Sequence, residues 1–174
     1  MQTAYALNPE GARTGMLYDG GEHDIVTRIS AVAQPFGTFV IKTAGDGLVA
    51  KVAAAAGATS VLEGVVVYSQ SIQSGLAGDG VTPAVEAGKP INILRKGRIW
   101  VYCETDFNPD TDTLFVRFTA NGAGKIVGQV RKDADTGKGD ELGASGYGVA
   151  YTALNTLTAA GFLALDINLP STVR

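Results

Sequence analysis

The chain contains one histidine and one cysteine, and these two side chains limit the acid–base and nucleophilic chemistry available to it. His23 lies in a Gly-Gly-Glu-His-Asp segment, and Cys103 follows a run of apolar residues. A catalytic serine or cysteine needs a base within hydrogen-bond reach, so a hydrolytic site would depend on His23. No nucleophile signature surrounds either residue, and one histidine with one cysteine cannot supply the usual zinc ligands. We therefore predict no catalytic residues, no zinc site and no cofactor, with Cys103 as a buried thiol.

Acidic and amide side chains alternate along residues 106–112 with a spacing similar to that of calcium loops. These residues are Asp106, Asn108, Asp110 and Asp112. An EF-hand loop needs glycine at its sixth position and a bidentate glutamate at its twelfth, but these positions hold Thr111 and Arg117. A second acidic pair, Asp133 and Asp135, is followed by Gly137 at the fifth loop position and Lys138 at the sixth, which also departs from the pattern. We predict ordinary turn residues and no metal site, with calcium binding by these loops as the alternative.

Charge and hydropathy narrow the class of partner. The chain of 174 residues has a formal net charge of −3 and a pI of about 5.1, so no basic face favours nucleic acid. No stretch approaches the roughly 20 apolar residues that span a bilayer, and the beginning of the chain lacks the pattern of a signal peptide. We expect a soluble, unprocessed protein that binds neither nucleic acid nor membranes.

Short apolar runs separated by turn residues indicate the fold class. Hydrophobic residues make up 45% of the chain but aromatic residues only 7%, and 23 residues are glycine, which suits strands and turns. The patterns predict strands at 25–29, 38–42, 48–52, 61–68, 114–118, 125–131 and 163–169. Gly64 inside its run predicts a bulge. We predict an all-β fold, an antiparallel β-barrel or sandwich with an extended N-terminal arm and long Gly-rich loops.

Residues 91–103 contain two apolar runs around a short basic segment, and we predict a hairpin there. A loop at 95–97 with Gly97 in the left-handed conformation would fix the register. Arg98 and Trp100 would then share the face opposite the apolar one, which suits a half-covered or interface surface. The candidate contact residues are Arg95, Lys96, Arg98 and Trp100. Solvated charges at an ordinary hairpin tip are the alternative.

Residues 1–22 hold scattered glycines and single apolar residues without sustained periodicity, which is typical of an extended arm. Such an arm can order against a neighbouring subunit, because burial of its anchors offsets the entropy of fixing it. Its candidate contact residues are Tyr5, Leu7, Met16 and Tyr18. A loop packed on its own domain is an equal alternative. We predict one β domain over residues 23–174, with a long loop at 69–90 and a mobile loop at about 132–148.

Three short motifs occur along the chain in a characteristic order. A Pro-Phe-Gly step at 35–37 opens a strand, and a Leu-Arg-Lys-Gly-Arg-Ile-Trp-Val run at 94–101 follows a loop rich in glycine and proline. A Gly-Phe-Leu-Ala-Leu-Asp-Ile-Asn strand at 161–168 closes the chain. In order and spacing these motifs resemble the structural cement (head decoration) proteins of tailed bacteriophages, although the insert at 132–148 has no counterpart.

The resemblance implies a non-enzymatic protein on the outer capsid surface of the virion, assembled in the cytoplasm of the bacterial host. Its implied partners are the major capsid protein, whose neighbouring subunits it would bridge, and further copies of itself in a dimer or trimer.

Two other classes of function stay open. A carbohydrate-binding or adhesive β-sandwich module would present exposed aromatic side chains. The candidates for such a surface are Tyr5, Tyr18, Tyr68, Trp100, Tyr102 and Tyr147. A hydrolase would instead use His23 together with the acidic loops.

Overall fold

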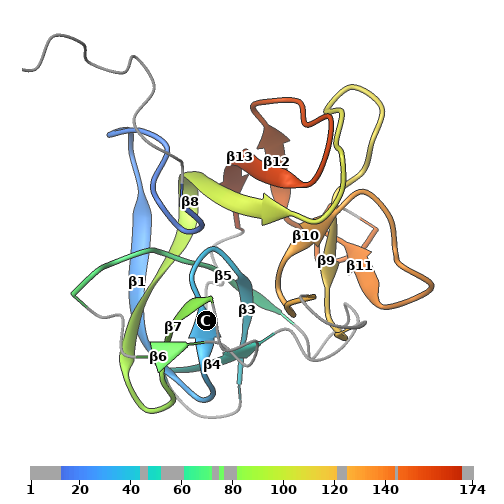
Figure 1. The fold of residues 1–174 in the computed structure, drawn as a ribbon. Helices are drawn as coiled ribbons and strands as arrows, with labels where there is room; N and C mark the ends of the chain where they lie inside the picture. The colour runs from blue at the N-terminus through green and yellow to red at the C-terminus, as the bar shows by residue number, and fades with distance from the viewer. Residues whose placement is uncertain are drawn as a thin grey trace, which may run out of the picture.

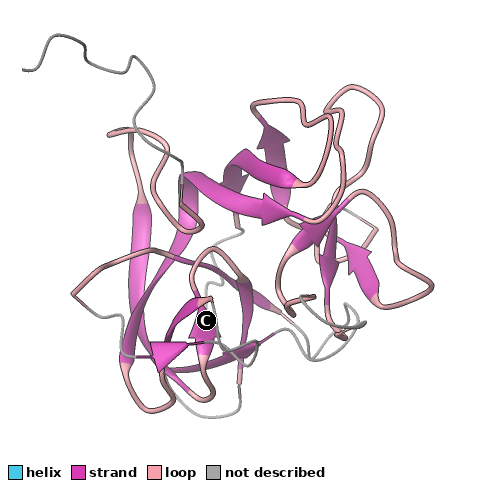
Figure 2. Cartoon of the chain, in the orientation of Figure 1, coloured by secondary structure: helices cyan, strands magenta, loops and turns pink. Residues whose placement is uncertain are grey.

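The computed structural model describes residues 13–43, 47–51, 61–71, 75–76, 82–120, 125–143 and 145–169. Within these ranges the chain forms thirteen strands and no helix (Figure 2), which confirms the prediction of an all-β fold. The described segments accordingly contain no helix able to cross a membrane. The candidate contact residues Tyr5 and Leu7 lie outside the described residues.

The strands of the described residues divide between a ten-stranded sheet and a three-stranded sheet of order β2-β7-β6. In chain order they are β1 Asp24–Ser30, β2 Gln34–Pro35, β3 Phe39–Lys42, β4 Leu48–Lys51, β5 Leu62–Val66, β6 Gly75–Leu76, β7 Pro83–Val85, β8 Pro90–Cys103, β9 Phe115–Arg117, β10 Val130–Arg131, β11 Gly139–Glu141, β12 Ala150–Ala153 and β13 Gly161–Asn168.

The 14-residue strand β8 joins two groups of strands, β1–β7 on one side and β9–β13 on the other (Figure 1). Its first half pairs with β1 and β5, and its second half pairs with β13. The predicted hairpin at 91–103 is therefore wrong. Gly97 does have a positive φ, +126°, but the chain continues through it in the strand. Partner strands take up the backbone hydrogen-bonding groups of both halves, and this non-local pairing outweighs the local turn signal.

The strands β1, β4, β3, β5 and β8 pair in succession, and β8 pairs again with β1. β3 and β4 lie in the segments predicted as strands at 38–42 and 48–52 and pair antiparallel, and Gly64 lies at a register shift, which confirms the predicted bulge. The apolar interior of this half consists of Phe36, Val40, Val49, Val66, Val85, Ile91 and Ile93. Among the described residues the larger sheet as a whole does not close into one barrel, so the structure supports the all-β class but not the predicted barrel or sandwich.

In the other half, β9 and β10 lie within the segments predicted as strands at 114–118 and 125–131 and pair antiparallel, and β13 lies on β8 with alternate leucine and isoleucine side chains buried. Three strands occupy segments predicted to be loops. β6 and β7 lie within residues 69–90, and β11 lies within residues 132–148. Strands of two or three residues are too short to show a period in the sequence, so pattern analysis misses them.

Candidate interaction surface

Residues 15–18 lie along β8, and their backbone bonds to it as an additional strand would. The Gly15 amide donates to the Trp100 carbonyl at 2.7 Å, and the Tyr18 amide donates to the Arg98 carbonyl at 2.9 Å. In its second half β8 therefore has β13 on one edge and this segment on the other. The described part of the predicted arm packs on its own chain, and contact of the arm with a neighbouring subunit stays a prediction.

Two glycines allow this segment to approach the domain. Gly15 and Gly37 have φ values of +82° and +70°. A Cβ on Gly15 would lie 2.7 Å from the Val66 carbonyl oxygen, and a Cβ on Gly37 would lie 2.6 Å from the Gly15 amide nitrogen. Both distances are too short for a side chain, so both positions require glycine. Gly37 of the Pro-Phe-Gly step thus leaves the space in which Gly15 and the N-terminal segment pack. We call the contact of Gly15 with Gly37 the seat of this segment.

Side-chain alternation along the segment and β8 separates a core face from an outward face. Leu17 pairs with Ile99, and both pack in the larger core cluster. Residues on either side of these two point outward, and β13 continues the outward face because Phe162 pairs with Tyr102. We call the outward group the aromatic face, which comprises Met16, Tyr18, Trp100, Tyr102 and Phe162.

The aromatic face is held together by ring contacts and remains open to solvent. The Tyr18 and Trp100 ring centroids lie 5.2 Å apart, and the Tyr102 and Phe162 rings meet edge to face at 6.1 Å. Tyr18 is 44% exposed, Phe162 39% and Met16 38%. Aromatic pairs at these separations attract each other beyond their area burial, so the rings are held in place before any partner binds.

Arg98 closes one end of the aromatic face with two ion pairs. Its Nη1 lies 2.8 Å from Asp19 Oδ2, and its Nε lies 3.1 Å from Asp166 Oδ2. The hydrogen bond to Asp166 raises the pKa of Arg98. The hydrogen bond from the Gly21 amide is the main cause that lowers the pKa of Asp19 below its ordinary value of 3.8, and the hydrogen bond from Arg98 is the next. Arg98 is therefore paired with two carboxylates and lies within β8, not at a hairpin tip, although its side chain is 46% exposed.

The other predicted contact residues lie near this end or beyond the described ranges. Lys96 Nζ lies 3.9 Å from Glu22 Oε2, and both side chains are exposed. A shallow pocket of about 220 Å³ opens beside them. Its lining residues are Asp19, Gly21, Glu22, Lys96, Gly97, Arg98 and Asp166. Arg95 is half-buried on β8. The structure thus brings Met16, Tyr18, Arg98 and Trp100 together, and their role as contacts stays a prediction.

The structure separates the two side chains on which catalysis would depend. His23 contacts Gly97, because a Cβ built there would lie 2.5 Å from His23 Cδ2. Cys103 is fully buried six residues further along β8, about 20 Å away at the usual rise per residue. Burial raises the pKa of Cys103 above its ordinary value of 9.0, so the thiol stays neutral. The two residues therefore cannot form a nucleophile–base pair.

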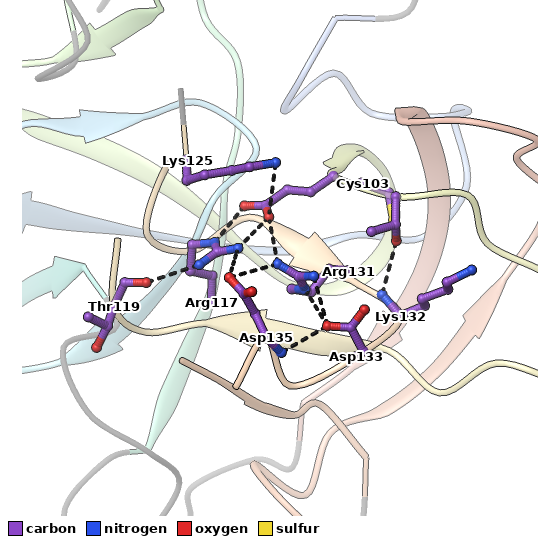
Figure 3. Close-up of polar contacts among 10 residues, drawn as sticks. Cys103, Arg117, Thr119, Lys125, Arg131, Lys132, Asp133 and Asp135 are labelled. Atoms are coloured by element: carbon purple, nitrogen blue, oxygen red, sulfur yellow. Dashed lines mark hydrogen bonds and ion pairs between the residues drawn. The ribbon is translucent and has the colours of Figure 1, made fainter. Parts of the chain in front are cut away.

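A buried ion-pair network lies where β8, β9 and β10 meet (Figure 3). The Arg117 side chain is 0% exposed, and it donates from Nε to Glu104 Oε1 at 2.7 Å and from Nη2 to Glu104 Oε2 at 2.6 Å. Its Nη2 also lies 2.7 Å from Asp135 Oδ2. The Glu104 hydrogen bonds raise the pKa of Arg117, so the guanidinium remains charged in the interior.

Further charges extend this network toward the surface. Arg131 Nη1 lies 3.3 Å from Glu104 Oε2 and 2.9 Å from Asp135 Oδ2, and its Nη2 lies 2.7 Å from Asp133 Oδ1. Lys125 Nζ lies 3.7 Å from Glu104 Oε2. The network ties residues 125–135 to the end of β8. Sequence analysis missed it because Glu104 and Arg117 are 13 positions apart and belong to no local motif.

The acidic residues considered for calcium make turn and ion-pair contacts. The Asn108 amide donates to Asp112 Oδ2 at 2.9 Å, and the Asp110 amide donates to Asn108 Oδ1 at 3.1 Å. Asp106 Oδ2 lies 2.6 Å from Lys132 Nζ, which lowers the pKa of Asp106. Among the described residues no group of three His, Cys, Asp or Glu side chains could hold a metal ion.

Comparison with known proteins adds two findings. The sequence matches a family described as "Structural cement protein (E217 gp24/Pam3 gp6)" over residues 1–165. The fold is similar to that of a chain in a structure described as "The capsid of Myoviridae Phage XM1", with a TM-score of 0.61, 12% identity and 97% coverage of both chains. At this identity the second likeness concerns the fold alone. No curated protein sequence matches the chain significantly.

Proposed function

The chain belongs to the family of structural cement proteins, and we propose that it binds the outer surface of a phage head and bridges neighbouring major capsid subunits. Membership makes it a capsid-associated structural protein of a bacteriophage virion. The proposed role is non-enzymatic and needs neither cofactor nor metal. It also includes self-association into a dimer or trimer.

The aromatic face is the observation that carries the proposed attachment. Large apolar side chains are normally buried, and a group of exposed ones on one surface marks a site of interaction. Tyrosine, tryptophan and methionine are the residue types enriched at protein interfaces. The rings of Tyr18 and Trp100 are held against each other on extended backbone, so little side-chain entropy would be lost on binding. We assign the contact with the capsid protein to this face.

Bridging requires a second contact surface on the same molecule. β1 offers one, because alternate residues on its outward side are apolar and exposed. Ile25 is 39% exposed and Ile29 40%, and Val32 after the end of the strand is 42% exposed. Thr27 lies between the two isoleucines and bonds to Asn92, so this strip carries no charge. A surface with two apolar contact areas on different strands suits a protein that joins two neighbours.

The test is attachment to purified heads that lack this protein. Trp100→Ala and Tyr18→Ala should each weaken attachment by about 2 kcal/mol or more, the usual cost of removing an aromatic anchor, or roughly thirtyfold. Val61→Ala is the matched control, since Val61 is 45% exposed and lies outside the aromatic face and the β1 strip. Unchanged attachment of both aromatic variants would remove this face from the mechanism.

The same variants separate this proposal from the carbohydrate-binding alternative. A sugar-binding module would bind glycans through its exposed aromatic rings and lose that binding in Trp100→Ala. If the wild-type chain binds glycans and does not attach to heads, carbohydrate binding would replace the proposed function.

The candidate contacts Tyr5 and Leu7 need a separate variant. Removing residues 1–12 leaves the seat formed by Gly15 and Gly37 in place, so the domain should fold. If the arm contacts a neighbour, this truncated protein should attach more weakly than the full chain. Equal affinity of the two proteins would exclude the arm from attachment.

A further inference from the structure

β12 has an open edge. It pairs with β13 alone, through Ala150–Asn168, Tyr151–Ile167, Thr152–Asp166 and Ala153–Leu165 (Figure 1). Its side chains are exposed or half-exposed along the whole strand. The strand therefore ends this side of the larger sheet among the described residues.

Two residues of β12 have backbone N–H and C=O groups that face away from β13. Leu154 donates its amide to the Ala164 carbonyl, and antiparallel pairing alternates bonded and non-bonded pairs. Thr152 is therefore bonded to β13, whereas the N–H and C=O groups of Tyr151 and Ala153 face the other way. None of the described residues donates to or accepts from these outward groups. They form a short row of donors and acceptors available to another strand.

This edge is short, at four residues, but it lacks the other features that normally prevent pairing. Exposed edge strands are usually protected by charged side chains, proline or a bulge. β12 has the sequence Ala-Tyr-Thr-Ala and contains none of these, and its pairing with β13 has no register shift. An uncharged, regular edge continuous with the main sheet is suited to adding a strand.

We propose that the partner of this edge is the β12 edge of a second copy, paired antiparallel about a two-fold axis through Thr152. In that register Tyr151 faces Ala153 of the other copy, so each copy satisfies both outward donors and both outward acceptors of its partner. Thr152 meets its own equivalent as a non-hydrogen-bonded pair, and facing threonine side chains stabilise such a pairing.

The side chains support the same register. On one face the large Tyr151 lies beside the small Ala153 of the other copy. On the other face Leu154, which is 38% exposed, would cover Ala150 of the other copy. A large residue meets a small one at each of these positions, and no charged side chain of β12 opposes its own equivalent. A strand from an unrelated protein would have no reason to match this order of residues.

This interface rests on the proposed self-association and adds which surface pairs and that the oligomer is a dimer. It is tested on the purified full chain without heads. Thr152→Cys should form an interchain disulfide quickly under mild oxidation, because non-hydrogen-bonded partners have Cα atoms about 4.5 Å apart. The matched control is Thr156→Cys, an exposed threonine in the segment after β12. Native Cys103 is fully buried and should not interfere.

Ala153→Pro provides the second measurement. Proline removes an outward N–H that β13 does not use, so it should leave the fold intact, as proline does at sheet edges. Sedimentation should show a dimer for the full chain and for Ala153→Ser, and a monomer for Ala153→Pro of unchanged circular dichroism. If Ala153→Pro fails to fold, the cross-linking rates decide alone.

A wild-type chain that sediments as a monomer, or a dimer that persists in folded Ala153→Pro, would overturn the inference. So would a Thr152→Cys variant that cross-links no faster than Thr156→Cys. Because no heads are present, these outcomes are independent of whether the protein attaches to a capsid.

Discussion

Removal of the Glu104 carboxylate tests the ion-pair network most directly. Glu104 is 1% exposed at its side chain and accepts hydrogen bonds from Arg117 at 2.6 and 2.7 Å. Arg131 and Lys125 also contact it. In Glu104→Ala, the buried Arg117 guanidinium would keep Asp135 and the Thr119 carbonyl as partners and lose its bidentate acceptor. The interior would then contain more positive than negative charge.

Breaking a buried ion pair by removing one partner costs about 3–5 kcal/mol, because the remaining charge stays desolvated. For a chain of this length each kcal/mol corresponds to about 2–4 °C in Tm, so Glu104→Ala should lower Tm by roughly 6–20 °C. Asp133→Ala removes a carboxylate from the same network, but Asp133 is 51% exposed at its side chain. An exposed pair contributes about 0–1 kcal/mol, so this matched control should be nearly unchanged.

The assay is urea unfolding followed by circular dichroism, with calorimetry for Tm. A double variant, Glu104→Leu with Arg117→Leu, should lose less stability than Glu104→Leu alone, because it removes both desolvated charges. If Glu104→Ala costs less than about 1 kcal/mol, or no more than Asp133→Ala, the buried ion pair does not stabilise the fold in this way. A double variant less stable than the single one would also contradict this role.

Three further predictions concern other parts of the chain. Gly97→Val should destabilise the protein by about 2 kcal/mol or more, because φ is +126° and the new Cβ would lie 2.5 Å from His23 Cδ2. The control Gly20→Val should have little effect, because there is open space around Gly20. Equal urea midpoints for the two variants would contradict this prediction. Lys132 lowers the pKa of Asp106 below 3.8, so the contribution of this ion pair to stability is complete above pH 3.8 and is lost as pH falls through the lowered pKa. Asp106→Asn should remove that acid-dependent part, and identical pH–stability curves would show that the pair contributes nothing. Burial and the raised pKa of Cys103 should protect its thiol from reagents at pH 8 until urea unfolds the chain; rapid labelling of the native protein would show that the site is open.

Several elements could be predicted because their information is local. Alternating apolar residues in β13 and the continuous apolar run of β5 each specify an extended backbone within a few positions. From one histidine and one cysteine we also predict no catalytic set, which stays a prediction, while the structure does separate these two side chains along β8.

Other features depend on residues that are distant in sequence. The segment 95–97 has the composition of a turn, yet it continues as a strand because β1 and β13 lie along the two halves of β8. The Gly37 of the Pro-Phe-Gly step is recognisable in the sequence, but only the structure shows that Gly15 occupies the space where its Cβ would lie.

The sequence by itself therefore determined the all-β class, most strands, the family resemblance and the residue types of the candidate contacts. Only the tertiary structure decided that Met16 and Tyr18 stand beside Trp100, that Arg117 is buried against Glu104, and that β12 has an open edge. The physical reason is that side-chain alternation reports which face of one strand is apolar. Which strand lies alongside it is determined by packing and hydrogen bonding between segments that no local pattern connects.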